Sequence, residues 1–204
     1  MRRLLNMYAY ALVLTILLSC DRNDEGYETT YPDILTEMAD VLTDSEGRMV
    51  RMLTDKGTEY SISNPPSGYV KEARYRLVCG YVPNGNTARL YNMTGVNILR
   101  DSTEVAAKDP TVVVSAWRAG GYINMHLSPL TQGGVQYWGF IVDRCEPGNI
   151  HVSLHHRQNG DPASYSRDAY ASLPVEYLDG VEEGDIITLH VNTTTGEKEW
   201  NFRR

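Results

Sequence analysis

The chain has 204 residues and a formal net charge of −7, with 26 acidic side chains against 19 basic ones. An acidic chain argues against nucleic acid as a partner, because that binding depends on Lys and Arg neutralising phosphates. The sequence also lacks Gly-x-Ser-x-Gly, His-Glu-x-x-His and a phosphate-binding glycine loop, which disfavours the common hydrolase and nucleotide-binding classes.

Residues 1–19 have the pattern of a secretory signal peptide. Arg2 and Arg3 form a basic start, and an apolar run follows over residues 7–18. A helix of about twelve residues is about 18 Å long, whereas crossing a bilayer takes about 20 residues. The run therefore predicts a cleaved leader rather than a membrane span.

The leader ends in Leu17-Leu18-Ser19-Cys20. This stretch resembles the lipobox of bacterial lipoproteins, in which the Cys sulfur takes a diacylglyceryl group and the freed amine takes a third chain. We therefore expect an acylated Cys20 that binds the lipid bilayer, since two or three chains anchor a protein stably. The alternative is an ordinary secreted leader with an incidental cysteine.

Residues 20–32 predict a flexible tether, because they have low apolar content and no periodicity. The tether opens with the acidic stretch Asp21-Arg22-Asn23-Asp24-Glu25. Such a stretch beside an acylated cysteine resembles two sorting signals, one for retention at the inner membrane and one for export to the cell surface. We favour an outer-membrane lipoprotein displayed on the surface, with a periplasm-facing position as the alternative.

Residues 33–105 predict a small β-barrel domain, in which short β-type runs alternate with turns. Residues 34–42 are ambiguous and would tolerate a helix. Four clearer strands follow, over residues 49–53, 58–62, 73–82 and 87–98. Five strands in about 65 residues suit an OB-like barrel, with its usual helix between the third and fourth strands missing or reduced to one turn.

Residues 106–204 predict an immunoglobulin-like β-sandwich, so the fold class is all-β. The polar stretch 99–110 is the expected boundary, and all three Trp, both Phe and all five His follow it. Short strands with turns every 8–12 residues are typical of a sandwich. Residues 111–117 are apolar on both faces, which indicates a strand buried on both sides or a linker strand between sheets.

Several features of the second half resemble the NigD-like lipoproteins. They are Asp109-Pro110 before a strand ending in Trp117, then Gly120-Gly121-Tyr122-Ile123-Asn124, Leu154-His155 before Gly160-Asp161, and Tyr165-Ser166 before Leu173-Pro174. The resemblance implies an N-terminal OB domain, a C-terminal β-sandwich and export behind a lipobox. The family is named for a bacteriocin gene cluster, and the resemblance assigns no catalytic residue.

The cysteines left after Cys20 are Cys79 and Cys145. Cys79 alternates with Tyr75, Leu77 and Tyr81 on one face of a strand, which is typical of a core residue. Cys145 falls in the other predicted domain. We therefore expect neither a disulfide between them nor a catalytic cysteine.

His155, His156 and Asp161 form a weak candidate polar cluster. His155 and His156 point to opposite faces of a continuous strand, and His151 lies about 13 Å from His155 along it. A site could combine His155 and Asp161 with His126 or His190, but metal ligands must lie within a few Å of one another. We expect no metal and no cofactor, and a plain turn at residues 159–162 explains Asp161 as well.

The sequence gives only indirect indications of a further modification and of the function. Asp101-Ser102-Thr103 resembles a bacterial O-glycosylation acceptor, which makes Ser102 a possible modified residue. Our first hypothesis is a membrane-anchored, non-enzymatic binding module for an unknown protein or glycan partner. The alternatives are a bacteriocin-associated accessory or immunity protein, and a hydrolase that uses the His155/Asp161 region.

Overall fold

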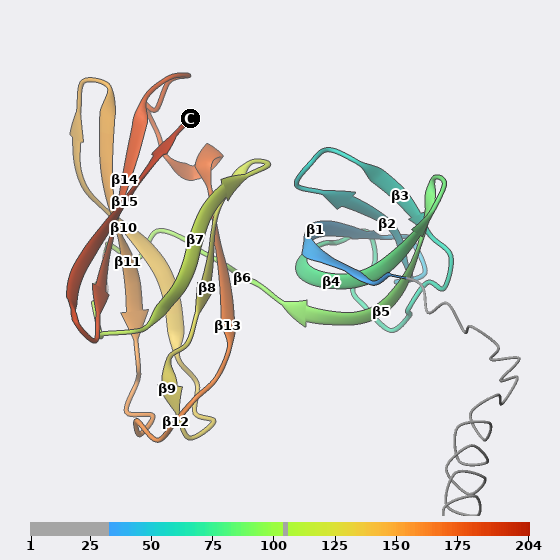
Figure 1. Ribbon diagram of the computed structural model, residues 1–204, viewed down its shortest axis with the longest axis horizontal. Helices are drawn as coiled ribbons and strands as arrows, with labels where there is room; N and C mark the ends of the chain where they lie inside the picture. Colours follow the sequence, from blue (N-terminus) through green and yellow to red (C-terminus); the bar gives the residue numbers. More distant parts are fainter. Residues whose placement is uncertain (1–32, 104–105) are drawn as a thin grey trace, which may run out of the picture. The chain divides into compact units, whose positions relative to one another are not determined.

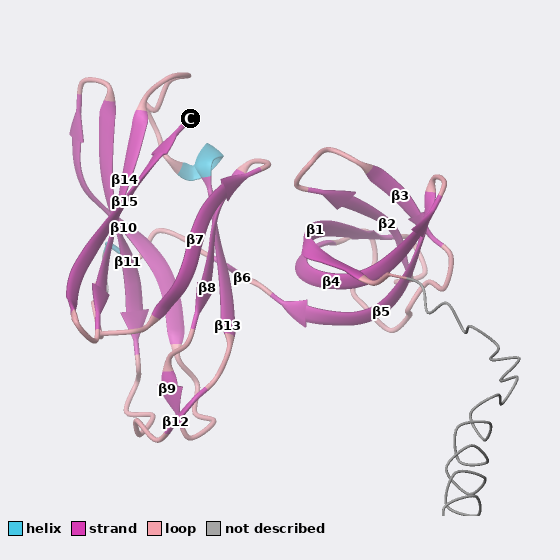
Figure 2. Cartoon of the chain, in the orientation of Figure 1, coloured by secondary structure: helices cyan, strands magenta, loops and turns pink. Residues whose placement is uncertain are grey.

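The computed structural model describes residues 33–103 and 106–204. Cys20 and the segments predicted to be a signal peptide and a tether lie outside the described residues. Within them the chain is built from strands, turns and loops, with a short 3-10 helix, η2 (Val175–Tyr177) (Figure 1, Figure 2). No helix in this part of the chain is both long enough and apolar enough to cross a bilayer.

The N-terminal part is a closed five-stranded barrel with the strand order β1-β2-β3-β5-β4. Its strands are β1 (Leu35–Thr43), β2 (Met49–Thr54), β3 (Glu59–Ile62), β4 (Arg74–Asn84) and β5 (Thr87–Gly95). Residues 63–73, between β3 and β4, contain turns and no helix. The expected OB-like barrel is confirmed.

The ambiguous segment at residues 34–42 is strand β1, and burial on both of its faces explains the ambiguity. Ala39 and Val41 belong to the barrel core, whereas Met38 and Asp40 contact the other half of the chain. Because both faces are buried, the sequence lacks the alternation of apolar and polar residues that marks a half-exposed strand.

The expected core face of β4 is also confirmed. Leu77, Cys79 and Tyr81 are buried, and Tyr75 packs against them. Cys79 is a free thiol, and burial raises its pKa to about 12. Cys145 is also free and lies exposed on the sandwich.

The C-terminal part is a β-sandwich of two four-stranded sheets, with the strand orders β6-β13-β8-β7 and β10-β11-β14-β15. A two-stranded sheet, β12-β9, adjoins them. The strands are β6 (Asn97–Ile98), β7 (Val113–Ala119), β8 (Tyr122–Leu127), β9 (Leu130–Thr131), β10 (Tyr137–Glu146), β11 (Asn149–Arg157), β12 (Tyr165–Ser166), β13 (Ala169–Pro174), β14 (Ile186–Thr193) and β15 (Gly196–Arg203). The core between the sheets includes Ile123, Met125, Val152, Leu154 and Leu189.

Residues that precede the boundary expected after residue 105 already belong to the sandwich. Strand β6 pairs with β13, and Leu99 is fully buried in the sandwich core. The polar stretch beyond it is no linker, because its backbone pairs with the sheet. Ser102 N–H donates to the carbonyl of Phe140, and Asp109 N–H donates to the carbonyl of His156. We call residues 100–109, less the undescribed 104–105, the strap.

The sequence left two interpretations of residues 111–117, and the structure excludes the strand buried on both faces. It supports the strand that crosses between sheets, because Thr111 pairs with Thr193 of β14 and the chain then continues as β7 in the other sheet. Strand β7 lies at the edge of its sheet and pairs with β8 on one side. Val112 and Val114 are exposed there. An edge strand with apolar side chains on its open face gives the same sequence pattern as a central strand.

A buried polar network joins the barrel to the sandwich through Arg76 of β4. The Arg76 side chain is 1% exposed and donates to both carboxylate oxygens of Asp55, at 2.6 and 2.7 Å. It also donates to Asn124 Oδ1 of β8 at 3.1 Å, and its guanidinium carbon lies 4.0 Å from the ring centroid of Tyr122. Ser172 Oγ of β13 donates to the same Asn124 oxygen at 2.6 Å.

Candidate functional site

The outer face of the sheet β10-β11-β14-β15, turned away from the sandwich core, carries an unusual set of polar side chains. Strand alternation places Val152 and Leu189 in the core and their neighbours on the opposite face. Those neighbours are His151 and Ser153 on β11 and His190 on β14, and His151 and Ser153 are buried although they point away from the core. Charged side chains of neighbouring strands therefore cover them.

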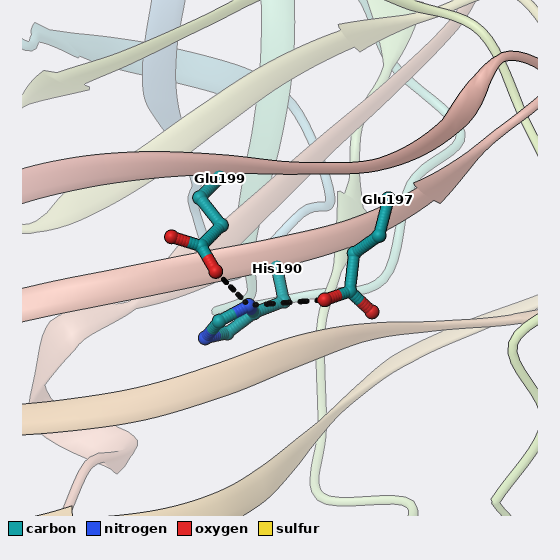
Figure 3. Close-up of side chains that lie close together, drawn as sticks. All are labelled: His190, Glu197 and Glu199. Atoms are coloured by element: carbon teal, nitrogen blue, oxygen red, sulfur yellow. Dashed lines mark ion pairs between the residues drawn. The ribbon is translucent and has the colours of Figure 1, made fainter.

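One group on this face consists of His190, Glu197 and Glu199, which we call the His–Glu cluster. In the β14–β15 hairpin His190 is the cross-strand partner of Glu199, and Glu197 lies two residues before Glu199 on the same face. His190 Nδ1 is 3.2 Å from Glu199 Oε1 and 3.6 Å from Glu197 Oε1. Figure 3 shows both carboxylates turned toward the imidazole.

His151 supports the other side of the His190 ring. His151 Nδ1 lies 3.0 Å from His190 Nε2, and the two rings stack with centroids 5.3 Å apart. His151 Nε2 lies 3.0 Å from Asn149 Nδ2 and 3.2 Å from Arg144 Nη2, which are both donors. His151 Nε2 must therefore accept, so its proton is on Nδ1 and is donated to His190 Nε2. The His190 proton is then on Nδ1, the ring nitrogen that faces the two glutamates.

The second feature of this face is a hollow of about 640 Å³ at the far end of β10 and β11. Tyr137 of β10 and its cross-strand partner Arg157 of β11 line it, together with His155 of β11. Residues Asp101 to Thr103 of the strap close one side, and Trp138 and Asn159 complete the lining. Its size falls in the range of about 300–1,000 Å³ that is typical of ligand pockets.

Gly139 is what allows the strap to lie against the sheet here. A Cβ at this position would overlap Ser102 Oγ and would lie 2.7 Å from the carbonyl oxygen of Arg100. The strap turn is held by Asp101, whose Oδ1 accepts from the N–H and the hydroxyl of Thr103 at 2.9 and 2.6 Å. These two hydrogen bonds hold the pKa of Asp101 below its usual range, and the one from the Thr103 hydroxyl has the larger effect.

The structure separates the two histidines of the predicted cluster. His155 lies on the outer face, and its Nδ1 accepts from Ala107 N–H of the strap at 2.8 Å. Burial lowers the pKa of His155. His156 points to the opposite face, where it stacks on Trp138 with ring centroids 4.0 Å apart. Its Nε2 lies 2.9 Å from Gln136 Oε1, and burial lowers its pKa as well.

Asp161 is connected with His156 rather than with His155. Gln136 Nε2 donates to Asp161 Oδ2 at 2.8 Å, so Gln136 bridges the two residues. Asp161 also accepts from the Thr131 hydroxyl and from the N–H groups of Gln132 and Gly134, at 2.9 and 3.1 Å. These hydrogen bonds lower the pKa of Asp161 to about 2, and the one from the Thr131 hydroxyl has the largest effect. An aspartate with this many donors organises a loop.

A serine, lysine and aspartate also meet on the outer face. Ser153 Oγ donates to Asp143 Oδ2 at 2.5 Å and accepts from Lys108 Nζ at 2.7 Å. Lys108 Nζ lies 3.0 Å from Asp143 Oδ1. Ser153 is 2% exposed, so a substrate cannot reach its hydroxyl. The group fastens the strap, which carries Lys108, to the sheet.

The sequence argument missed the His–Glu cluster, although a signal for it was present. Thr193-Thr194-Thr195-Gly196 has the composition of a turn, and it closes a hairpin in which Thr193 pairs with Gly196. A hairpin of known turn length has a fixed register, and counting back from the turn places His190 opposite Glu199.

Comparison with known proteins agrees with this architecture. Residues 95–204 match the family model of the NigD-like C-terminal β-sandwich domain, and no curated protein matches the chain. A NigD-like immunity protein from Bacteroides caccae is 25% identical, with a TM-score of 0.65 over 85% of this chain and 98% of the other.

Two further solved structures share the fold at lower identity. A protein of unknown function from Bacteroides vulgatus is 15% identical, with a TM-score of 0.67 over 84% of this chain and 91% of the other. A protein from Bacteroides fragilis, provisionally named a lipoprotein, is 11% identical, with a TM-score of 0.57 over 84% of this chain and 97% of the other. Since the family model covers more than half of the chain, this protein belongs to the NigD-like family.

Proposed function

We propose that the protein is a lipid-anchored, non-enzymatic binding module of the cell envelope. Acylated Cys20 anchors it to the outer membrane, facing the cell surface, and the sandwich binds the ligand. The provisional name of the Bacteroides fragilis relative supports the lipoprotein assignment. The observation that carries the binding function is the hollow on the outer face of the sandwich.

The lining of the hollow suits a glycan. The Tyr137 ring is 51% exposed, so it offers an apolar surface on which the C–H face of a sugar can stack. Arg157, Asn159 and Asp101 supply donors and acceptors for sugar hydroxyls. An aromatic surface beside a few fixed polar groups is the usual composition of a small-ligand site.

The positions of the candidate catalytic side chains support a non-enzymatic function. The hydrolase alternative pairs His155 with Asp161, but His155 lies with the strap while Asp161 binds the loop at residues 131–136. The Ser153 hydroxyl, held between Lys108 and Asp143, is buried. A nucleophile and a base must reach a common substrate atom, and these groups do not converge.

The experiment is a screen of envelope oligosaccharides against the purified protein, followed by calorimetric titration with each candidate. We expect a binder whose affinity falls with Tyr137→Ala and with Arg157→Ala. Tyr165→Ala is the matched control, because Tyr165 is equally exposed on β12 and does not line the hollow. Unchanged binding in both hollow variants, or no binder in the screen, would refute the glycan site.

A second candidate function is bacteriocin immunity, which the name of the Bacteroides caccae relative favours. Under this proposal the sandwich binds a toxin, and deletion of the gene makes a producing strain sensitive to its own bacteriocin. Unchanged sensitivity of the deletion strain contradicts it. The two functions are separable, because the immunity function requires no oligosaccharide ligand.

A further inference from the structure

We propose that the His–Glu cluster is a binding site for a divalent transition-metal cation of the Zn²⁺ type. The cluster lies on β14 and β15, and the proposal is independent of the glycan site. It runs against our expectation from the sequence, which found no set of ligands close enough together. The hairpin register supplies that set.

Two distances within the cluster, those from His190 Nδ1 to the glutamate oxygens, are close to those between ligands of one metal ion. Zn–N and Zn–O bonds of about 2.0–2.2 Å in a tetrahedral site place two ligand atoms about 3.3–3.5 Å apart. His190 Nδ1 is 3.2 Å from one glutamate oxygen and 3.6 Å from the other. All three ligand atoms lie within 4.8 Å of one another. A small rotation of one carboxylate completes the three-ligand face.

The supports of the three ligands also suit a metal site. The His190 side chain is 12% exposed and is fixed by its strand and by His151, whereas the Glu197 and Glu199 side chains are 59% and 56% exposed and can adjust. Two carboxylates beside one imidazole leave an excess of negative charge in either protonation state of the ring, which a divalent cation would offset. A mixed nitrogen and oxygen ligand set suits Zn²⁺, and the fourth position would hold water.

His151 supplies the outer hydrogen bond that a metal-binding histidine requires. Such a histidine donates its second ring N–H to a neighbouring acceptor, which fixes the orientation of the ring. His190 Nε2 already lies 3.0 Å from His151 Nδ1. Metal at His190 Nδ1 displaces the proton held there, so the bond to His151 must reverse, with His190 as the donor.

After this reversal, a neighbouring carboxylate can accept the proton of His151. His151 would then carry its proton on Nε2, so the donors Arg144 and Asn149, which now face that nitrogen, must turn away from it. Glu146 Oε2 lies 4.0 Å from His151 Nε2 and can accept that proton, while its Oε1 keeps the 2.8 Å pair with Arg144 Nε. Metal binding therefore predicts a change of tautomer in both histidines, which a simple ion pair would not produce.

The test is calorimetric titration of the full chain, stripped of metal by a chelator, with Zn²⁺, and with Co²⁺ for its visible spectrum. We expect one site, which Glu197→Gln and Glu199→Gln weaken and His190→Ala abolishes. Removal of an outer-sphere partner typically lowers metal affinity about 10- to 100-fold, and we expect this of His151→Ala.

The matched control is His126→Ala. His126 Nε2 pairs with Asp168 Oδ1 at 2.9 Å, so this variant removes a histidine–carboxylate pair that is outside the cluster. Nitrogen-detected NMR of the imidazoles gives the second readout, with His190 Nδ1 metal-bound and the His151 proton moved to Nε2. Equal Zn²⁺ affinity in His190→Ala and the parent chain overturns the proposal, and so does the absence of any binding. Unchanged histidine tautomers on Zn²⁺ addition overturn the assigned coordination.

Discussion

Replacement of Arg76 by alanine is the sharpest test of how the barrel and the sandwich are joined. Arg76 extends from β4 of the barrel and contacts Asn124 of the sandwich. It is also the buried cation between two carboxylates, Asp55 at 2.6 Å and Asp40 at 3.7 Å. Its removal therefore affects both halves of the chain.

The magnitude follows from these contacts. Arg76→Ala removes three hydrogen bonds to Asp55 and Asn124, and it leaves the Asp55 carboxylate, which is 10% exposed, without its cation, while Asp40 keeps its pair with Arg74. Removing one partner of a buried ion pair costs about 3–5 kcal/mol. We expect the free energy of unfolding to fall by that amount. For a chain of this size the fall corresponds to a decrease in Tm of about 6–20 °C.

The assay is urea unfolding followed by two signals. All three tryptophans lie in the sandwich, so fluorescence follows that half, while far-UV circular dichroism follows all strands. Arg74→Ala is the control, because Arg74 pairs with the same Asp40 but its side chain is 56% exposed. Exposed pairs contribute about 0–1 kcal/mol, so this variant should unfold close to the parent chain.

Two results would refute the reasoning. If Arg76→Ala costs no more than Arg74→Ala, burial does not make the Arg76 network important. If circular dichroism shifts while the tryptophan transition keeps its midpoint, the network stabilises the barrel alone and does not couple it to the sandwich. Cooperative unfolding of both halves in the parent chain is the condition for reading one free energy from either signal.

Four further predictions concern the strap, the loop at Asp161 and the anchor. Gly139→Ala should destabilise the fold by about 1–3 kcal/mol, as overpacking does, since its Cβ would overlap Ser102. Urea unfolding measures the change, and Gly95→Ala is the control because Gly95 has open space around it. Asp161 has its pKa lowered to about 2 from 3.8, so its stabilisation is complete above pH 4 and is lost as the pH falls toward 2. Amide exchange in the loop at residues 131–136 should rise over that window, and Asp161→Asn should remove the pH dependence. Cys20→Ala should release the protein from membrane fractions or leave it unprocessed, and labelled lipid on this variant would contradict the lipoprotein assignment. Mass spectrometry of the native protein should find a glycan that Ser102→Ala removes, and an equal mass for both proteins would reject the modification.

The fold could be predicted from the sequence because alternation survives wherever a strand has one buried face. Cys79 and its neighbours on β4 show that alternation, and they are core residues. The pattern failed where both faces of a strand are buried, as at β1, and where an edge strand exposes apolar residues, as at Val112 and Val114. Alternation reports the burial of a residue's own side chain, and it does not report which neighbour buries it.

The pairing of residues 99–110 with the sandwich was hidden in the sequence for a related reason. These residues were expected to hold the boundary because they are polar, yet Leu99 is a core residue and the polar residues beyond it pair with the sheet through their backbone. Backbone pairing leaves no trace in composition. A strap across a sheet and a solvated linker therefore have the same sequence signature.

The candidate site depends on register more than on residue type. His155, His156 and Asp161 are close in sequence, yet two adjacent strand residues point to opposite faces, and Asp161 is held by a different loop. His190 and Glu199 are nine residues apart but directly opposite in a hairpin. In an all-β protein, the residues that meet on one face are those at equal distances from a turn. A search for sites in such sequences should therefore begin at the turns and count outward along both strands, which here leads from Thr193 and Gly196 to the His–Glu cluster.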